Sequence, residues 1–379
     1  MRVIIAPDKF KGSLPADAVA EALATGIARV TAADVELVPM ADGGDGTVDA
    51  ALRAGYTASR HTVTGPIGEP VEAVLAIRGD TAVVELATAS GLALLPTDSL
   101  APVTATSRGT GELVAAALDA GCTRIVLGLG GSACTDGGAG LLAALGVRFL
   151  DAAGRRLPDG GAALADLTRV DLAGLDPRLV RTDFVVALDV DNPLLGETGA
   201  AAIFGPQKGA SPDQVRQLDD ALAHYARALA ATIGSVVDDA AATPGAGAAG
   251  GVGFAALAIL GATPQTGLEL VADLVGLAER VRGADLVITG EGSLDEQSLS
   301  GKTPVGVARI TRAAGVPHVV AVCGVSTLDE NQVVAGGFDA VWTLADLESD
   351  VARSIANAAA LLTLTGEQIG RWIATKESR

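Results

Sequence analysis

The sequence has few aromatic residues and few cysteines, and both shortages exclude classes of protein. Aromatic residues make up 3% of the 379 positions, whereas hydrophobic residues make up 49% and there are 48 glycines. This balance favours an α/β fold packed from Ala, Val and Leu over an aromatic-rich β-sandwich. Cys122, Cys134 and Cys323 are scattered and form no Cys-x-x-Cys pair, so we expect neither a disulfide framework nor a zinc site. Such sparse cysteine usage fits a reducing cytoplasm.

Positive charge and histidine are also scarce. The chain carries 27 Lys and Arg against 45 Asp and Glu, a net charge of −18, which argues against nucleic acid and anionic membranes as partners. The three histidines lie in no motif, and neither a Ser/His/Asp triad nor a Gly-x-Ser-x-Gly elbow is present. Hydrolase chemistry of those kinds is disfavoured. Phosphoryl transfer needs only cations, Mg²⁺ and one positioned carboxylate.

The sequence lacks a long uninterrupted apolar run. Residues 240–268 carry no charge, but their apolar centre, 248–262, is shorter than the ~20 residues that a membrane span needs and is interrupted by Gly250, Gly251 and Gly253. We predict a buried helix entered through a glycine loop. The N-terminus has too short an apolar run and too early a charge for a signal peptide, and it is typical of a first β-strand.

The two ends of the chain share one rhythm of strands and helices. We predict strands at 3–6, 35–39, 285–289, 316–323 and 340–344, with helices at 15–29, from 47, at 304–314 and from 346. Between them the rhythm changes, with hairpin-like alternation at 71–86, a helix after 110, and strands at 124–129 and 184–190. We therefore expect a Rossmann-like, three-layer parallel-sheet domain built from residues 1–60 and 271–379. A second α/β domain, 61–270, is inserted into it.

Only five of the basic residues are lysine, and four of these lie beside glycine or in a loop: Lys9, Lys11, Lys208 and Lys302. A compact ammonium beside a flexible backbone suits contact with phosphate or carboxylate. For any one of these lysines taken alone, the alternative interpretation is an exposed loop lysine that binds no ligand. Because Lys9 and Lys11 lie where a strand end meets a helix start, we favour anion binding for them.

A glycine-rich loop follows the strand predicted at 124–129. Residues 128–133 match the dinucleotide fingerprint Gly-x-Gly-x-x-Ala, which by itself leaves a nicotinamide cofactor open. The loop continues through Thr135 and Asp136, and added hydroxyl and carboxylate groups suit a magnesium nucleotide better. Residues 300–303 resemble the end of a P-loop, but Glu296 occupies the leading glycine position, so we reject a Walker A motif.

Carboxylates gather in three further loops, 42–46, 189–193 and 291–295, each after a predicted strand. Strand alternation would put Asp189 and Asp191 on one face, which suits one magnesium ligand beside one base. Turn-forming Asp and Gly explain any single loop as well. Several such loops at strand carboxyl ends, where open α/β sheets bind ligands, favour an active site.

Together these motifs resemble the class I glycerate kinase family over essentially the whole chain. The segments that carry the resemblance are 6–13, 41–47, 109–113, 130–133 with 136–138, 189–194, 207–209, 247–251, and 290–292 with Asp295, Gln297, Gly301 and Lys302. The family implies ATP-dependent phosphorylation of D-glycerate in the cytoplasm, with Mg²⁺ as cofactor. Its bacterial members mostly make 2-phosphoglycerate, and the active site lies in an interdomain cleft. We expect a monomer or a small homo-oligomer.

The resemblance also distributes roles among the residues. Asp189 is the expected base, with Asp295 as the competing one, and Asp191 and Glu291 are expected to hold Mg²⁺. Glycerate is assigned to Lys9, Lys11, Ser13, Asp42, Arg108 and Asn192, and ATP to Gly130, Gly131, Ser132, Asp136, Lys208 and Lys302.

Four departures from the family pattern stand out. Cys134-Thr135 replaces a frequent Thr-Asn, Asp45 a frequent Glu, Arg108 a common aromatic residue and Ser293 a common Arg. We hypothesise that Arg108 supplies the cation missing at Ser293. Two other functions stay open at this point. One is a nicotinamide-dependent hydroxy-acid dehydrogenase, and the other is a non-enzymatic sensor of small carboxylates.

Overall fold

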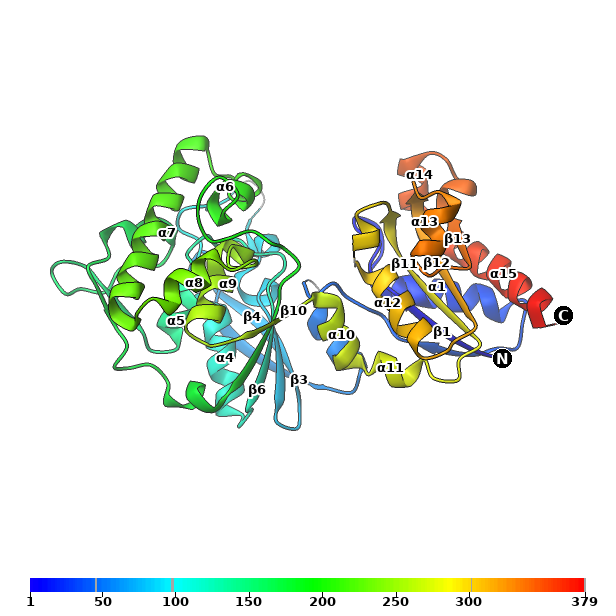
Figure 1. Ribbon diagram of the computed structural model, residues 1–379, viewed down its shortest axis with the longest axis horizontal. Coiled ribbons are helices and arrows are strands. Elements are labelled where there is room, and N and C mark those ends of the chain that lie inside the picture. Colours follow the sequence, from blue (N-terminus) through cyan, green and yellow to red (C-terminus); the bar gives the residue numbers. More distant parts are fainter. Residues whose placement is uncertain (45, 97–98, 301, 378–379) are drawn as a thin grey trace. The chain divides into compact units, whose positions relative to one another are not determined.

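The computed structural model describes residues 1–44, 46–96, 99–300 and 302–377. The chain divides into two compact units, one made of Met1–Asp42 and Leu268–Arg379 and the other of Gly43–Gly267. Each unit has its own β-sheet covered by helices, and Figure 1 shows that blue strands from the N-terminal end and yellow to orange strands from the C-terminal end share the first sheet. The prediction of an α/β fold with parallel sheets is confirmed.

The chain first crosses between the units at 42/43, earlier than the expected crossing at 60/61, and it returns at 267/268 rather than 270/271. The short helix α2 (Thr47–Arg53) explains the first difference, because it packs against strands β4 and β5 of the second unit. The domain limits of 1–60 with 271–379 and of 61–270, as limits of independently folding domains, stay a prediction.

The sheet of the chain-end unit is parallel throughout, in the order β13-β12-β11-β1-β2. In this doubly wound arrangement the strand order reverses between β1 and β11, and the carboxyl ends of strands at such a reversal form a binding crevice. The strands are β1 (Arg2–Pro7), β2 (Asp34–Leu37), β11 (Leu286–Leu294), β12 (His318–Ser326) and β13 (Ala340–Thr343).

Helices cover both faces of this sheet and give the expected three layers. Val3 and Ile5 face α1 and α15, whereas Val319 and Ala321 face the side of α12 and α13. The helices α1 and α15 pack very closely, because a Cβ added at Gly26 would lie 1.9 Å from a backbone oxygen of α15.

The closing helix expected from 346 is preceded by two short pieces, η6 and α14. The helical elements of this unit are α1 (Ala16–Ala28), α10 (Gly267–Val275, whose first residue belongs to the second unit), α11 (Leu277–Arg280), η5 (Ser298–Ser300), α12 (Thr303–Ala313), α13 (Glu330–Ala335), η6 (Leu344–Asp346), α14 (Val351–Ala356) and α15 (Ala358–Glu377).

The inserted unit has a mixed sheet in the order β10-β9-β6-β5-β4-β3. The strands β10, β9, β6 and β5 run parallel to one another, and β4 runs antiparallel to both of its neighbours, β5 and β3. The alternation at 71–86 therefore does form a hairpin, which joins β4 to β5. The strands are β3 (Thr57–Thr64), β4 (Pro70–Arg78), β5 (Thr81–Glu85), β6 (Arg124–Gly128), β9 (Asp183–Ala187) and β10 (Thr263–Gln265). A separate antiparallel pair joins β7 (Arg148–Leu150) to β8 (Arg169–Asp171).

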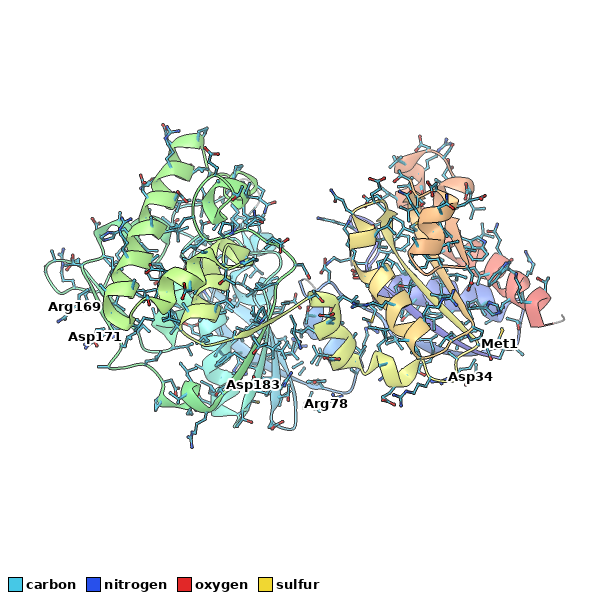
Figure 2. The ribbon with its side chains drawn as sticks, in the orientation of Figure 1. Met1, Asp34, Arg78, Arg169, Asp171 and Asp183 are labelled. Atoms are coloured by element: carbon cyan, nitrogen blue, oxygen red, sulfur yellow. The ribbon has the colours of Figure 1, made fainter. Side chains whose placement is uncertain are left out.

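The long helix α7 lies beside β8, whose Arg169 and Asp171 are labelled in Figure 2. It begins with a capping box in which Ser211 and Gln214 satisfy each other's backbone N–H groups. The helical elements are α2, α3 (Ala87–Ser90), η1 (Leu92–Leu94), α4 (Arg108–Asp119), α5 (Ala139–Ala144), η2 (Gly161–Asp166), η3 (Pro177–Arg181), α6 (Ala200–Phe204), η4 (Pro206–Lys208), α7 (Pro212–Ile233), α8 (Val236–Ala242) and α9 (Ala248–Ala258).

The uncharged segment 240–268 contains the buried helix α9, as predicted. Its first turn is kinked, because Ala249, Gly250 and Gly251 adopt left-handed backbone conformations. Two of the three positions are glycine, the residue that accepts this conformation at no steric cost. In the described ranges, no helix combines the length and apolar character needed to cross a membrane.

Candidate functional site

In the chain-end unit, acidic side chains meet at the carboxyl ends of β1 and β11. Asp8 directly follows β1 and is only 6% exposed. Its Oδ2 accepts a hydrogen bond from Thr303 Oγ1 at 2.8 Å, and its Oδ1 accepts one from the Lys9 amide at 2.6 Å. Burial, reinforced by the negative charge of Asp42, raises the pKa of Asp8 to about 6. A carboxyl with this pKa at a strand-order reversal is a candidate functional group.

Two predicted residues lie on the β11 side of this cluster. Ser298 Oγ donates to Glu291 Oε1 at 2.7 Å, and the Ser298 amide donates to Asp295 Oδ1 at 3.0 Å. Burial raises the pKa of Glu291, whereas the Ser298 amide lowers the pKa of Asp295. The same serine therefore links two carboxylates whose pKa values move in opposite directions.

Three of the predicted lysines belong to this unit. Lys9 Nζ lies 3.4 Å from Asp42 Oδ1, and Lys302 Nζ lies 3.9 Å from Asp295 Oδ1. Lys11 is exposed, in a tight turn from 10 to 14 whose backbone passes beside Gly292 of β11. The structure thus brings Lys9, Asp42 and the Lys11 turn to one end of the sheet.

The Ser13 side chain, near the end of that turn, bonds another segment of the protein. Its Oγ donates to the carbonyl of Ile355 in α14 at 3.1 Å. Two residues named in the sequence analysis, Asp45 among the family departures and Gly301 of the motif that contains Lys302, lie outside the described residues.

In the inserted unit, Asp136 is completely enclosed. Its carboxylate accepts bonds from Ser107 N at 2.8 Å, Ser107 Oγ at 2.9 Å, Gly138 N at 3.1 Å and Gly140 N at 3.2 Å. Burial raises its pKa even though all four donors favour the charged form. Asp136 therefore fixes the turn at 136–140 and the start of α4.

Lys208 is enclosed in a similar way and is 2% exposed. Its Nζ donates to Ser132 Oγ at 2.9 Å and to the Cys134 carbonyl at 2.5 Å, and burial lowers its pKa. The predicted nucleotide loop, with Gly130 and Gly131, is thus held from inside the protein by a lysine 76 residues away.

The glycine segment at the start of α9 connects this loop with the acidic loop after β9. The Gly137 amide donates to the Gly250 carbonyl at 3.0 Å, and the Gly247 amide donates to the Asn192 carbonyl at 2.9 Å. A Cβ on Gly250 would lie 2.1 Å from the Cys134 carbonyl oxygen, so only glycine fits there. Two predicted ligand loops of the inserted unit are therefore held on one support.

The acidic loop after β9 differs from the expectation in one respect. The strand ends at Ala187 rather than 190, so strand alternation does not decide on which side Asp189 and Asp191 lie. Both are exposed, and Asp189 Oδ1 accepts a bond from the Gly267 amide at 2.8 Å. The Asn192 side chain donates to the Thr198 carbonyl at 2.8 Å.

Arg108 occupies the first position of α4. Its Nε and Nη2 donate to the two oxygens of Asp159, each at 2.6 Å, in a bidentate ion pair. The hypothesis that Arg108 replaces a cation at Ser293 stays a prediction, because these residues belong to different units.

Sequence reasoning passed over four residues that the structure makes prominent. Asp8, Thr303, Asp159 and Glu85 each bond a predicted residue or a neighbouring helix, and the Glu85 carboxylate accepts from the Gly46 and Val48 amides at the start of α2. Asp8 and Glu85 could have been found from the sequence, because each lies at the carboxyl end of a strand. Within the described ranges, no three His, Cys, Asp or Glu residues are grouped as a metal site.

A family comparison identifies the chain. The model of the glycerate kinase family matches residues 3–374. The chain belongs to the glycerate kinase family. It is 47% identical over 350 residues to glycerate kinase of Bacillus subtilis (strain 168), covering 91% of this chain and 90% of that protein. It is also 47% identical over 348 residues to glycerate 2-kinase of Escherichia coli (strain K12), with the same two coverages.

A solved glycerate kinase structure has the same fold. A crystal structure described as glycerate kinase 2 of Salmonella typhimurium LT2 aligns with a TM-score of 0.85 and 40% identity, and the alignment covers 100% of both chains. The family resemblance and the α/β fold expected from the sequence are both confirmed. No comparison supports the dehydrogenase or the sensor alternative.

Proposed function

We propose that the protein transfers the γ-phosphoryl group of ATP to D-glycerate and releases 2-phosphoglycerate and ADP. The observation that carries this proposal is the 47% identity to glycerate 2-kinase of Escherichia coli over nine-tenths of both chains. Phosphorus NMR of the product from ATP and D-glycerate tests it, because 2- and 3-phosphoglycerate give distinct resonances. Formation of 3-phosphoglycerate would contradict the proposed position of phosphorylation. The absence of ATP turnover would contradict the kinase activity itself.

Glycerate binding is assigned to Lys9 and Lys11 of the chain-end unit, with Ser13, Asp42, Arg108 and Asn192 as the other expected contacts. Lys11 supports this role best, because it is exposed in a chain of net charge −18 and its turn lies against the end of β11. Lys9 is partly balanced by Asp42 at 3.4 Å. Ser13 and Arg108 bond other protein groups, so a direct role for either needs a change of partner.

ATP is assigned to the loop at 130–132 and to Lys302. The backbone of such a loop offers N–H groups to phosphates. Asp136 and Lys208 were expected to touch the nucleotide, but their enclosure supports an indirect role in which they hold the loop in shape. Lys302 is exposed, just before the first residue of α12, which suits contact with a phosphate.

The base that accepts the proton of the glycerate hydroxyl is Asp189 in this proposal, and Asp295 is its competitor. Asp189 is exposed, and its Oδ1 is held by the Gly267 amide. The lowered pKa of Asp295 makes this carboxylate a weaker base, which favours Asp189.

Mg²⁺ is the expected cofactor, with Asp191 and Glu291 as its candidate protein ligands. Mg²⁺ in kinases usually takes one or two carboxylates and completes its shell with water and substrate phosphates. The exposed Asp191 and the half-buried Glu291 fit that pattern, since neither needs further protein ligands around it. When bound, the ion neutralises phosphate charge.

An active site shared by two domains, a cytoplasmic location, and a monomeric or small homo-oligomeric state complete the proposal. The acidic composition and the three unpaired cysteines support the location. Size-exclusion chromatography with light scattering measures the oligomeric state.

A further inference from the structure

A pocket in the inserted unit lies among α4, α5, the β7 strand and the loop at 156–160. Its apolar walls include Val147, Phe149 and Leu157. Phe149 is held in place by an edge contact with Tyr225 of α7, with ring centroids 5.6 Å apart. One side of the pocket is therefore a fixed apolar surface.

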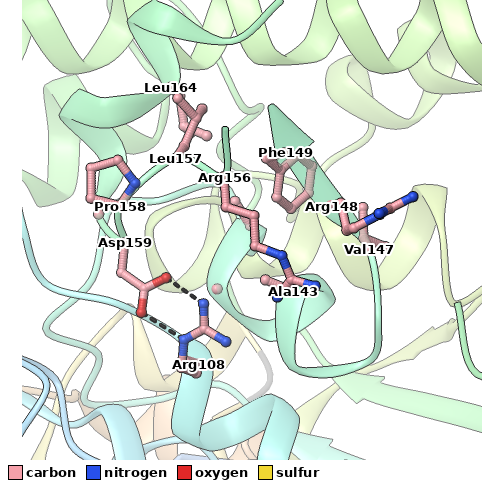
Figure 3. Close-up of a pocket in the computed structure, with 13 residues that line it drawn as sticks. Arg108, Ala143, Val147, Arg148, Phe149, Arg156, Leu157, Pro158, Asp159 and Leu164 are labelled. Atoms are coloured by element: carbon pink, nitrogen blue, oxygen red, sulfur yellow. Dashed lines mark hydrogen bonds and ion pairs between the residues drawn. The ribbon is translucent and has the colours of Figure 1, made fainter. Parts of the chain in front are cut away.

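Guanidinium groups line another side. Arg108, Arg148 and Arg156 all line the pocket, against one lining carboxylate, Asp159. Figure 3 shows the Arg156 side chain extending over Ala143, on the pocket side opposite the Arg108–Asp159 pair, whereas Arg148 points away. Arg148 is paired with Asp171. The positive groups of the pocket are thus Arg108 and Arg156.

These two arginines retain N–H donors that a ligand could use. Asp159 takes Nε and Nη2 of Arg108 and orients the fork, which leaves Nη1 unused by that pair. Arg156 makes no ion pair or side-chain hydrogen bond within the ranges that the structure describes. An oriented guanidinium beside a second, uncompensated one is an arrangement that binds oxyanions. Such a pair of positive groups stands out in a chain of net charge −18.

We propose that this pocket is a binding site for a small organic oxyanion. Its phosphate or carboxylate group lies between Arg108 Nη1 and the Arg156 guanidinium, and its carbon skeleton lies against Phe149 and Leu157. Among the residues assigned to the phosphoryl transfer, the site includes only Arg108. The other residues that line the pocket lie outside that assignment, so the site overlaps the proposed glycerate contacts at Arg108 alone.

The pocket also adjoins the network that shapes the nucleotide loop. Gly140 lines the pocket, and its amide bonds Asp136, which Ser107, the residue before Arg108, also holds. Ligand binding at Arg108 thus acts on the helix start that anchors the turn at 136–140.

The test uses the full chain and two probes, methyl phosphate and propionate, titrated by calorimetry at constant ionic strength. Arg156→Ala should weaken binding of the preferred probe by about tenfold or more. The matched control is Arg155→Ala, because Arg155 is the adjacent exposed arginine, pairs with Asp151 and does not line the pocket. It should bind as the wild type does. Arg156→Lys should recover little, since an ammonium cannot make the bidentate contact.

The choice of probe tells which oxyanion the pocket takes, and Lys11→Ala tells which site is being measured. Binding that survives Lys11→Ala and is lost in Arg156→Ala belongs to the pocket. Equal affinities in Arg156→Ala and Arg155→Ala would overturn the proposal, as would binding that is lost only in Lys11→Ala. The melting temperatures of both arginine variants should match that of the wild type, as is usual for substitutions at exposed positions.

Discussion

The charged residues at the strand ends of the chain-end unit bond one another and stay partly open to solvent, whereas Asp136 and Lys208 of the inserted unit are fully enclosed. Both sets come from motifs that look alike in sequence, loops rich in glycine and charge that follow a strand. The comparison teaches that a charged residue in a ligand-binding motif either meets the ligand or shapes the loop that does. Burial separates the two roles, because an enclosed charge has its bonds satisfied by the protein.

Asp136 and Lys208, the enclosed set, hold the nucleotide loop of the inserted unit rigid. The charged residues at the strand ends of the chain-end unit, the open set, leave groups available for substrate. Asp8 stands between these cases, since it is buried in the open unit and its pKa is raised to about 6. Four substitutions sharpen the comparison, and they follow from the largest expected effect to the smallest.

The first substitution decides which unit supplies the base. Asp189→Asn should lower kcat by about 100-fold or more while substrate binding is largely kept, because the amide cannot take the proton of the glycerate hydroxyl. Its amide oxygen can still accept the bond from Gly267. Steady-state kinetics of Asp189→Asn and Asp295→Asn, measured side by side, provide the matched pair. A near-normal kcat for Asp189→Asn would eliminate Asp189 as the base.

The second substitution tests the open set of cations. Lys11→Ala should raise the KM for glycerate by about 30-fold to 150-fold, the equivalent of roughly 2 to 3 kcal/mol of lost charge-assisted bonding. The KM for ATP should change much less. Initial rates at varied glycerate and ATP measure both constants. A loss of ATP affinity with unchanged glycerate affinity would assign the lysine to the nucleotide.

The third substitution tests the cost of burying Asp8. Its pKa of about 6 lies above the ordinary value of 3.8, so the folded protein binds the proton more tightly than the unfolded chain does. Stability therefore falls as the pH rises from about 4 to about 6, and the full cost, about 3 kcal/mol, is present above pH 6. Asp8→Asn removes this cost.

Urea unfolding at several pH values measures the effect. Asp8→Asn should be more stable than the wild type at pH 7 to 8 by up to about 3 kcal/mol, and the gain should vanish near pH 4. Asp220→Asn, at an exposed position of α7, is the control and should show no such pH-dependent gain. A constant difference at every pH would show that the carboxyl charge is not the cause.

The fourth substitution tests the enclosed set, and we expect its effect on stability to be the smallest. Lys208→Met leaves Ser132 Oγ and the Cys134 carbonyl without their donor, but it also removes an ammonium that burial disfavours. The two changes partly offset, so we expect a loss of about 1 to 2 kcal/mol.

The control for Lys208→Met is Lys302→Met, because Lys302 is exposed and lies 3.9 Å from its nearest carboxylate oxygen. Its unfolding free energy should stay within about 0.5 kcal/mol of the wild type. Equal melting temperatures for the two variants would contradict the role of Lys208 as a support of the loop.

The sequence by itself determined the α/β class, most strands of both sheets, the buried helix after the glycines and the family. These features follow from local patterns: apolar runs of strand length, helix periodicity, and glycine where the backbone must turn. The family motifs are also local, since each spans a few consecutive residues. The elements of the chain-end unit could be predicted for the same reason, because parallel strands alternate regularly with helices at both ends of the chain.

Only the tertiary structure decided which charged residues are enclosed, which partner Arg108 takes, and that α2 packs with the inserted unit. Each of these depends on residues distant in sequence, as in the bond from Lys208 to Ser132, 76 residues apart, or that from Arg108 to Asp159, 51 residues apart. A local pattern carries no record of such contacts, because burial and pKa are set by all the groups that surround a side chain in space.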